Sequence, residues 1–166
     1  MGIKSLYKDN CNIHALHKDN TYKIRAHHGL CLFFFKGKGY SREFVKNMMD
    51  FKNKLDKDPF VCITSKADII CGKCPNYIKD SCKNEDKVAE YDRQVLLRCN
   101  LTDGDILPYH SFRNLIVHNI ILSGKREEVC GNFQWTLLCH NISNGRQLLW
   151  PCLGSYKAAG PQISLC

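Results

Sequence analysis

Residues 41–64 read Ser41-Arg-Glu-Phe-Val-Lys-Asn-Met-Met-Asp-Phe-Lys-Asn-Lys-Leu-Asp-Lys-Asp-Pro-Phe-Val-Cys-Ile-Thr64. The first part predicts an amphipathic helix, because apolar residues recur at spacings of four, three and four. They are Phe44, Met48, Phe51 and Leu55. Ser41 is a favourable N-cap, and Asp58-Pro59 ends the helix. The β-branched and aromatic residues of Phe60–Thr64 predict a short strand directly after it.

The flanking sequence extends this pattern in both directions. Tyr22–Ala26 alternates like a short strand, and Asn84 and Pro108 are the expected starts of two further helices. The helix that starts at Asn84 carries apolar residues on one face: Val88, Tyr91, Val95 and Cys99. We therefore expect an α+β fold, mostly helical, in one small domain with about three helices, short strands and a cysteine-rich loop.

Composition divides the chain into three parts. Residues 1–21 are a polar extension, 22–140 form the cysteine-rich domain, and 141–166 carry glycine and proline without a sustained period, as an irregular tail does. The longest apolar run, Leu30–Phe35, is far shorter than the roughly 20 residues that a bilayer requires. The N-terminus has no apolar segment typical of a secretion signal. The expected location is therefore the cytoplasm, with no membrane association.

The cysteines give the strongest functional signal. The chain has 11 cysteines in 166 residues, an odd number, and a reducing cytosol seldom keeps disulfides. Cys71-Gly-Lys-Cys74-Pro75 places two thiolates in one tight turn, and Cys82 follows in the same polar loop. Zinc and iron–sulfur sites need about four such soft ligands. We expect Cys71, Cys74 and Cys82 to bind one metal centre.

The remaining cysteines fall into different classes. Cys130 and Cys139 are candidates for the fourth ligand, since closing the site from a distance would couple metal binding to folding. Those inside apolar patterns are expected to be buried structural thiols: Cys31, Cys62 and Cys99. Those in the two extensions are expected to be free: Cys11, Cys152 and Cys166.

His27-His28 is the second candidate feature. Both imidazoles titrate near neutral pH and are potential ligands or acid–base groups, against the alternative of a satisfied structural histidine. If the pair continues the preceding strand, the two side chains point to opposite faces. Lys36-Gly-Lys-Gly39 predicts a tight turn, and an anion site at the following helix is the alternative reading.

The formal net charge is +8, from 24 basic and 16 acidic residues. Basic residues are spread along the chain without a block of like charge, which favours a solvated basic surface over a nucleic-acid interface. Binding of nucleic acid or another anionic partner is therefore only weakly supported.

Several motifs in order resemble the domain-of-unknown-function family 1284, a group of small bacterial and archaeal proteins. The resemblance covers roughly residues 22–140. It rests on Ile24-Arg-Ala-His-His-Gly-Leu-Cys-Leu32, Lys36–Met48, Asp68-Ile-Ile-Cys-Gly-Lys-Cys-Pro-Asn76 with Cys82, and Cys130-Gly-Asn-Phe-Gln-Trp135 with Cys139. The family closes with C-x-x-C-x-W, and Phe133 stands here in place of the second cysteine. The resemblance implies iron–sulfur binding and brings no established activity.

These observations predict an iron–sulfur protein that transfers electrons or senses redox state, with a redox partner protein. The alternative cofactor is zinc, which would make the domain a stapled binding module with a basic surface. A third class, a thiol oxidoreductase using Cys71 and Cys74 directly, would need a helix starting within the motif, which residues 75–82 do not predict. No pattern indicates a particular enzymatic reaction.

Overall fold

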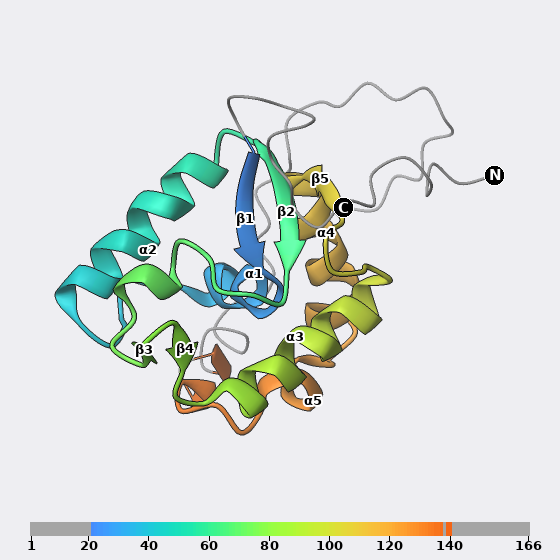
Figure 1. The fold of residues 1–166 in the computed structure, drawn as a ribbon. Coiled ribbons are helices and arrows are strands. Elements are labelled where there is room, and N and C mark those ends of the chain that lie inside the picture. The colour runs from blue at the N-terminus through green and yellow to red at the C-terminus, as the bar shows by residue number, and fades with distance from the viewer. Residues whose placement is uncertain (1–20, 138, 141–166) are drawn as a thin grey trace, which may run out of the picture.

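The computed structural model of the chain describes residues 21–137 and 139–140 (Figure 1). Its centre is a three-stranded sheet in the order β1-β2-β5. Strand β1 (Thr21–Arg25) runs parallel to β2 (Phe60–Thr64), and β5 (Ile106–Pro108) lies antiparallel on the other edge of β2. The fold is a small α+β domain, as the sequence predicts. The expected terminal extensions fall, apart from residue 21, outside the described residues.

Helix α2 (Arg42–Leu55) forms where the periodicity predicts it. The Ser41 side chain accepts a hydrogen bond from the backbone N–H of Phe44 at 3.1 Å, which caps the first turn. The predicted apolar face is buried in full: Phe44, Met48, Phe51 and Leu55. Figure 1 shows this helix on one side of the two parallel strands, with α4 on the other.

Helix α1 (Ala26–Phe34) is the main element that periodicity does not reveal. Its residues are nearly all apolar, so both a strand and a buried helix fit the pattern. The helix packs against α3 and α4, and it is buried on most of its circumference. Gly29 permits the contact with α4, because a Cβ there would overlap with Cε1 of Phe112.

The second half of the chain covers the end of the sheet. Helix α3 (Glu85–Cys99) buries Tyr91, Val95 and Cys99 as expected, although Asn84 makes no side-chain cap. Helix α4 (Tyr109–Ile116) begins after Pro108 and continues as one π-helical turn, Val117–Ile121. Helix α5 (Arg126–Cys130) follows and packs on α3. The described elements that the sequence did not predict include α1, α5, β5, the β3–β4 hairpin and the 3₁₀ turn Cys71–Lys73.

Candidate metal centre and adjacent pocket

Two histidines begin helix α1 directly after strand β1. His27 and His28 lie in its first turn, and their ring centroids are 4.3 Å apart. The prediction that they continue a strand and point to opposite faces is wrong, because the apolar run after them is helical. Consecutive helical side chains diverge by only about 100°, so both rings border the same cavity.

Asp68, in the loop after β2, holds His28 in place. Its Oδ2 accepts hydrogen bonds from Nδ1 of His28 at 2.9 Å and from the backbone N–H of Arg25 at 2.8 Å. Its Oδ1 accepts from the backbone N–H groups of Ile70 at 2.9 Å and Cys71 at 3.2 Å. A carboxylate offers about four lone-pair directions, so this one is saturated. Burial opposes its charge, but His28 and the N–H donors lower the pKa of Asp68 to about 2.

A second buried carboxylate, Asp92 on α3, holds His27. Its Oδ1 accepts from the backbone N–H of His27 at 2.9 Å and from its Nδ1 at 2.7 Å. Its Oδ2 accepts from Nε of Arg25 at 2.7 Å, and Arg25 also donates to Glu85 at 2.7 Å. Burial disfavours the charge of Arg25, but the hydrogen bonds to Glu85 and Asp92 raise its pKa. Two carboxylates and one guanidinium thus join the start of α1 to α3.

The two carboxylates fix the tautomer of each histidine. Burial opposes ionisation of Asp92, yet the hydrogen bonds and charge of His27 lower its pKa, so both acids are ionised and accept only. The proton of each imidazole is therefore on Nδ1, and Nε2 is left as an acceptor or a ligand. Burial, with the charge of His28, lowers the pKa of His27 to about 4. Carboxylate–histidine pairs of this kind orient metal-binding imidazoles.

The cysteine loop contains a 3₁₀ turn, Cys71–Lys73, and the hairpin of β3 (Tyr77–Ile78) and β4 (Ser81–Cys82). In the hairpin Tyr77 pairs with Cys82, so the chain returns Cys82 toward the segment that carries Cys74. This return explains how a loop without helical periodicity brings its third cysteine back to the first two.

The sulfur of Cys74 lies at a turn of backbone N–H groups. Burial raises the pKa of Cys74, and the neighbouring backbone N–H groups of Asn76 and Tyr77 act in the opposite direction. Burial, followed by the charge of Asp68, likewise raises the pKa of Cys71 to about 12, although the nearby Arg25 acts in the opposite direction. A thiol oxidoreductase needs a lowered thiol pKa, so this site disfavours that class. A metal, in contrast, displaces the thiol proton when it binds.

One group of potential ligand atoms is already assembled. A ring nitrogen of His28, a carboxylate oxygen of Asp68 and Sγ of Cys71 lie within 4.8 Å of one another. Asp68 is saturated and Nδ1 of His28 donates to it, so within this group only the sulfur of Cys71 is left to coordinate, while Nε2 of His28 faces away from Asp68. The three loop thiols, all in the described part of the chain, are not all within 4.8 Å of one another. A tetrahedral zinc ion would hold its thiolates about 3.8 Å apart.

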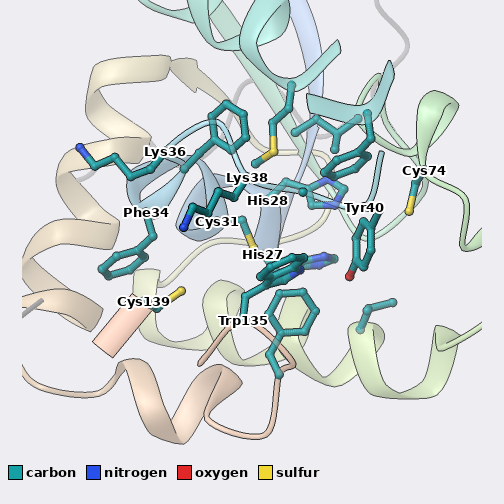
Figure 2. A pocket seen from close by; sticks show the side chains of 17 residues that line it. His27, His28, Cys31, Phe34, Lys36, Lys38, Tyr40, Cys74, Trp135 and Cys139 are labelled. Carbon is teal, nitrogen blue, oxygen red and sulfur yellow. The ribbon is translucent and has the colours of Figure 1, made fainter. Parts of the chain in front are cut away.

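A cavity of about 120 Å³ adjoins the histidines (Figure 2). Its lining is largely aromatic and aliphatic, and it comprises His27, His28, Cys31, Phe34, Phe35, Lys36, Lys38, Gly39, Tyr40, Phe44, Met48, Ile70, Cys74, Val88, Phe133, Trp135 and Cys139. Figure 2 shows Cys74 on one side of the histidine pair, and Cys31 and Cys139 on the other. Two predicted site residues, Cys74 and Cys139, therefore border one cavity from opposite sides.

Cys31, Cys130 and Cys139 form a second group of thiols. Cys31 is half-buried, packs against the apolar core and also borders the cavity, so its expected role as a buried structural thiol stays a prediction. Burial, followed by the neighbouring Cys130 and Cys139, raises the pKa of Cys31 well above its ordinary value. Burial also raises the pKa of Cys130 to about 11. The one-turn spacing of His27 and Cys31 would have indicated this neighbourhood had the run been recognised as a helix.

The other predicted residues are placed as follows. Cys99 is buried, as expected, at 3% exposure; Cys62 is also buried, at 0%, but it is disulfide-bonded, so the expectation of a thiol there is wrong. Phe133 forms part of the cavity wall, and its ring meets that of Tyr91 edge to face at 6.1 Å. The cysteines expected in the extensions lie outside the described residues: Cys11, Cys152 and Cys166. Participation of Cys130 or Cys139 in the metal centre stays a prediction.

Fold and site together define a small α+β protein with a pocket rich in cysteine and histidine. The chain matches the family described as "Protein of unknown function (DUF1284)" over residues 39–139, more than half of its length, and it belongs to this family. The match begins after the histidine motif. No curated protein and no solved structure matches the chain. Within the described residues, no helix has both the length and the apolar character needed to span a bilayer.

Proposed function

We propose that the protein binds a metal centre at the cysteine loop, with an iron–sulfur cluster as the cofactor and electron transfer or redox sensing as its role. Cys71, Cys74 and Cys82 would supply three thiolates. On binding, such a cluster exchanges single electrons at a potential that hydrogen bonds to its sulfurs adjust. In this role the protein would have a redox partner, and the proposal assigns no enzymatic reaction.

The observation that carries this proposal is the environment of Cys74. The backbone N–H groups of Asn76 and Tyr77 oppose the effect of burial on the pKa of this thiol, and the N–H of Tyr77 donates to the Cys74 carbonyl oxygen at 3.0 Å. Hydrogen bonds to the charged form of a group favour that form, so these donors stabilise a thiolate once a metal has displaced the proton. A turn whose thiols bind no metal would not require these backbone N–H groups. The hairpin, which returns Cys82 toward this segment, supports the same reading.

For the fourth position the geometry favours His28. Asp68 accepts from Nδ1 of the imidazole, which leaves Nε2 open as a ligand atom, and the ring borders the same cavity as Cys74. Histidine replaces cysteine at one iron of some clusters, where it raises the reduction potential. Cys139, the earlier candidate together with Cys130, lies across the cavity from Cys74 in Figure 2. We therefore propose His28 as the ligand and Cys139 as the alternative.

Zinc is the second candidate, favoured by the combination of three sulfurs and one nitrogen, which structural zinc sites also use. The spacing of the loop thiols favours a cluster, because a cluster binds its cysteines through separate irons and one zinc ion draws all four ligands together. A zinc-bound domain would lack redox chemistry. Its function would then lie in its basic surface and an anionic partner such as nucleic acid.

The test is the content of iron, zinc and acid-labile sulfide per chain in protein purified without oxygen. We expect iron and sulfide in stoichiometric amounts, lost in Cys74→Ser and retained in the control Cys11→Ser. Equal cofactor content in these two variants would overturn the ligand assignment. His28→Ala and Cys139→Ser separate the two candidates for the fourth position, since only the true ligand should lower retention. Zinc without sulfide would establish the alternative cofactor.

A further inference from the structure

We infer that the cavity beside the histidine pair is a binding site for a one-ring organic hydroxy acid, which contacts Lys38 through its carboxylate and Nε2 of His27 through its hydroxyl. This site shares Cys74 and His28 with the proposed metal centre, but it does not require the metal. The inference rests on the size of the cavity, its wall, and two polar groups that lack partners inside it.

Size and wall select the body of the ligand. The cavity measures about 120 Å³, less than the roughly 150 Å³ of an apolar protein cavity that holds a benzene molecule, so it admits at most one ring, and the carboxylate must lie at its mouth beside the exposed Lys38. Phe44, Met48 and Ile70 form part of the wall with Trp135. The indole of Trp135 meets the ring of Tyr40 edge to face at 5.9 Å, which fixes it in position. A flat ring is therefore the shape that fits.

Charge selects the first polar contact. Among the residues that the structure describes, no acidic one lines the cavity, whereas Lys36 and Lys38, both exposed, do. Figure 2 shows the amine of Lys38 on the side of the view that Cys31 and Phe34 occupy, and Lys36 directed farther away from the histidines. Neither lysine has an ion pair among the described residues, although nearby Lys46 pairs with Asp50 at 2.6 Å. A carboxylate on the ligand would give Lys38 the partner that it lacks.

The orientation of His27 selects the second polar contact. Its Nδ1 donates to Asp92 at 2.7 Å, so Nε2 carries a lone pair, and no partner for Nε2 exists within the described part of the protein. The side chain of His27 is only 10% exposed. A lone pair in this position accepts from a hydroxyl and repels a carboxylate. The ligand must therefore present a donor at this end and its negative charge at the other.

The experiment is a calorimetric titration of the protein as purified with 4-hydroxybenzoate, benzoate and 4-hydroxybenzyl alcohol. We expect 4-hydroxybenzoate to bind saturably and each of the other two to bind about tenfold more weakly, since each lacks one polar contact. Lys38→Met should reduce the affinity for 4-hydroxybenzoate to that for the alcohol. Lys46→Met is the matched control on the neighbouring helix and should leave the affinity unchanged.

A second variant tests the position of the ligand. Val88, half-buried on α3, lines the cavity, and Val88→Phe should fill it and abolish binding of all three compounds. Equal affinity for the three compounds, no saturable binding, or wild-type binding by Lys38→Met would each overturn the inference. Iron and zinc are measured on the same samples. Binding of 4-hydroxybenzoate by protein that contains no metal would support the pocket and contradict the metal centre. Metal in protein that does not bind the compound would contradict the pocket and support the metal centre.

Discussion

Asp68 is the single residue on which most of the site depends. It joins the start of α1, the loop before Cys71 and the imidazole of His28 through four hydrogen bonds. Its side chain is fully buried. These four hydrogen bonds bury no apolar surface, so their main effect is to orient the groups that donate to Asp68. An acid that saturates its lone pairs with N–H donors cannot itself ligate a metal without leaving a buried donor unpaired.

Asp68→Asn should destabilise the protein by about 2 kcal/mol, because the amide's NH₂ end leaves buried N–H donors unsatisfied. It should also weaken metal binding by about 10–100-fold, as the loss of a carboxylate behind a metal-bound histidine does. Urea denaturation and competition with a chelator measure the two effects. The control is Asp50→Asn, which removes an exposed ion pair with Lys46 and should cost less than about 1 kcal/mol. Identical behaviour of the two variants would contradict the role of Asp68.

The pH dependence of stability should follow from His27. Its pKa is about 4 in the folded protein against an ordinary value of 6.5, so the unfolded chain binds a proton more readily. The stabilisation is complete above about pH 6.5 and is lost as the pH falls toward 4, by about 3 kcal/mol in all. Asp68, with a pKa of about 2 against 3.8, removes further stability below that range.

Urea denaturation at a series of pH values tests this dependence. His27→Gln should flatten the slope between about pH 6.5 and 4. His110→Gln should not, because His110 is exposed. A wild-type stability that does not change across this interval would show that His27 does not titrate as described.

At the same scale, the sequence identifies the ligand-type residues but not the groups that position them. Cys71, Cys74 and His28 stand out because cysteine and histidine are rare and their spacing is short. Asp68 and Asp92 resemble the chain's other acidic residues, most of which lie on the surface. Only the fold places those two against the first turn of α1.

Among the elements, the β3–β4 hairpin is formed against local preference. Lys79 and Asp80 at its tip have φ angles of 49° and 60°, in the left-handed region that costs a side chain about 1 kcal/mol or more. The type I′ turn that they form suits Asn-Gly far better. The hairpin nevertheless returns Cys82 toward Cys74. We infer that this placement of Cys82 is why the chain keeps an unfavourable turn.

Replacing this pair by Asn-Gly (Lys79→Asn with Asp80→Gly) should therefore stabilise the protein by about 1 kcal/mol and leave its metal content unchanged. Asn100→Gly is the comparison, since Asn100 has a φ of 53° at the end of α3, outside the site. Urea midpoints and metal analysis are the measurements. If the Asn-Gly variant lost its metal, the side chains of the turn would have a role that the structure does not give them.

The contact of α1 with α4 tests whether α1 is placed correctly. Gly29→Ala would bring a methyl group into overlap with Cε1 of Phe112 and to 2.8 Å from Cδ1 of Ile116. We expect a destabilisation of about 1–3 kcal/mol, as overpacking of a core contact produces. Gly72→Ala is the matched control, because no atom lies within 4 Å of its added Cβ, and it should change stability by less than about 0.5 kcal/mol. Equal thermal midpoints would contradict this packing.

Elements with a clear period are predicted well, and uniformly apolar ones are not. Helix α2 and strand β2 follow the expected bounds closely, since one shows a helical spacing and the other a β-branched run. Helix α1 has no polar face to mark its period, because it is buried between α3 and α4. If the start of α1 were a strand, His27 and His28 would point to opposite faces. In the helix both border the cavity together with Cys31.

Over the whole molecule, segments distant in sequence meet at one cavity. Helix α1 contributes the histidines, the cysteine loop contributes Cys74, and the stretch after α5 contributes Trp135 and Cys139. The family match ends at residue 139, so it includes this last wall of the cavity. A basic chain that closes around a pocket without acidic lining is suited to an anionic ligand, and thiols on both sides suit a soft metal.

Native mass spectrometry of protein prepared without oxygen tests the central claim most directly, because the mass excess over the chain identifies the bound group. The account predicts an excess equal to a cluster of iron and sulfide on the wild-type chain, and a bare chain for Cys74→Ser. An excess of one zinc ion, lost in the same variant, would keep the site and change the cofactor. A bare mass for the wild-type chain, or the same excess in Cys74→Ser, would contradict a metal centre at the cysteine loop.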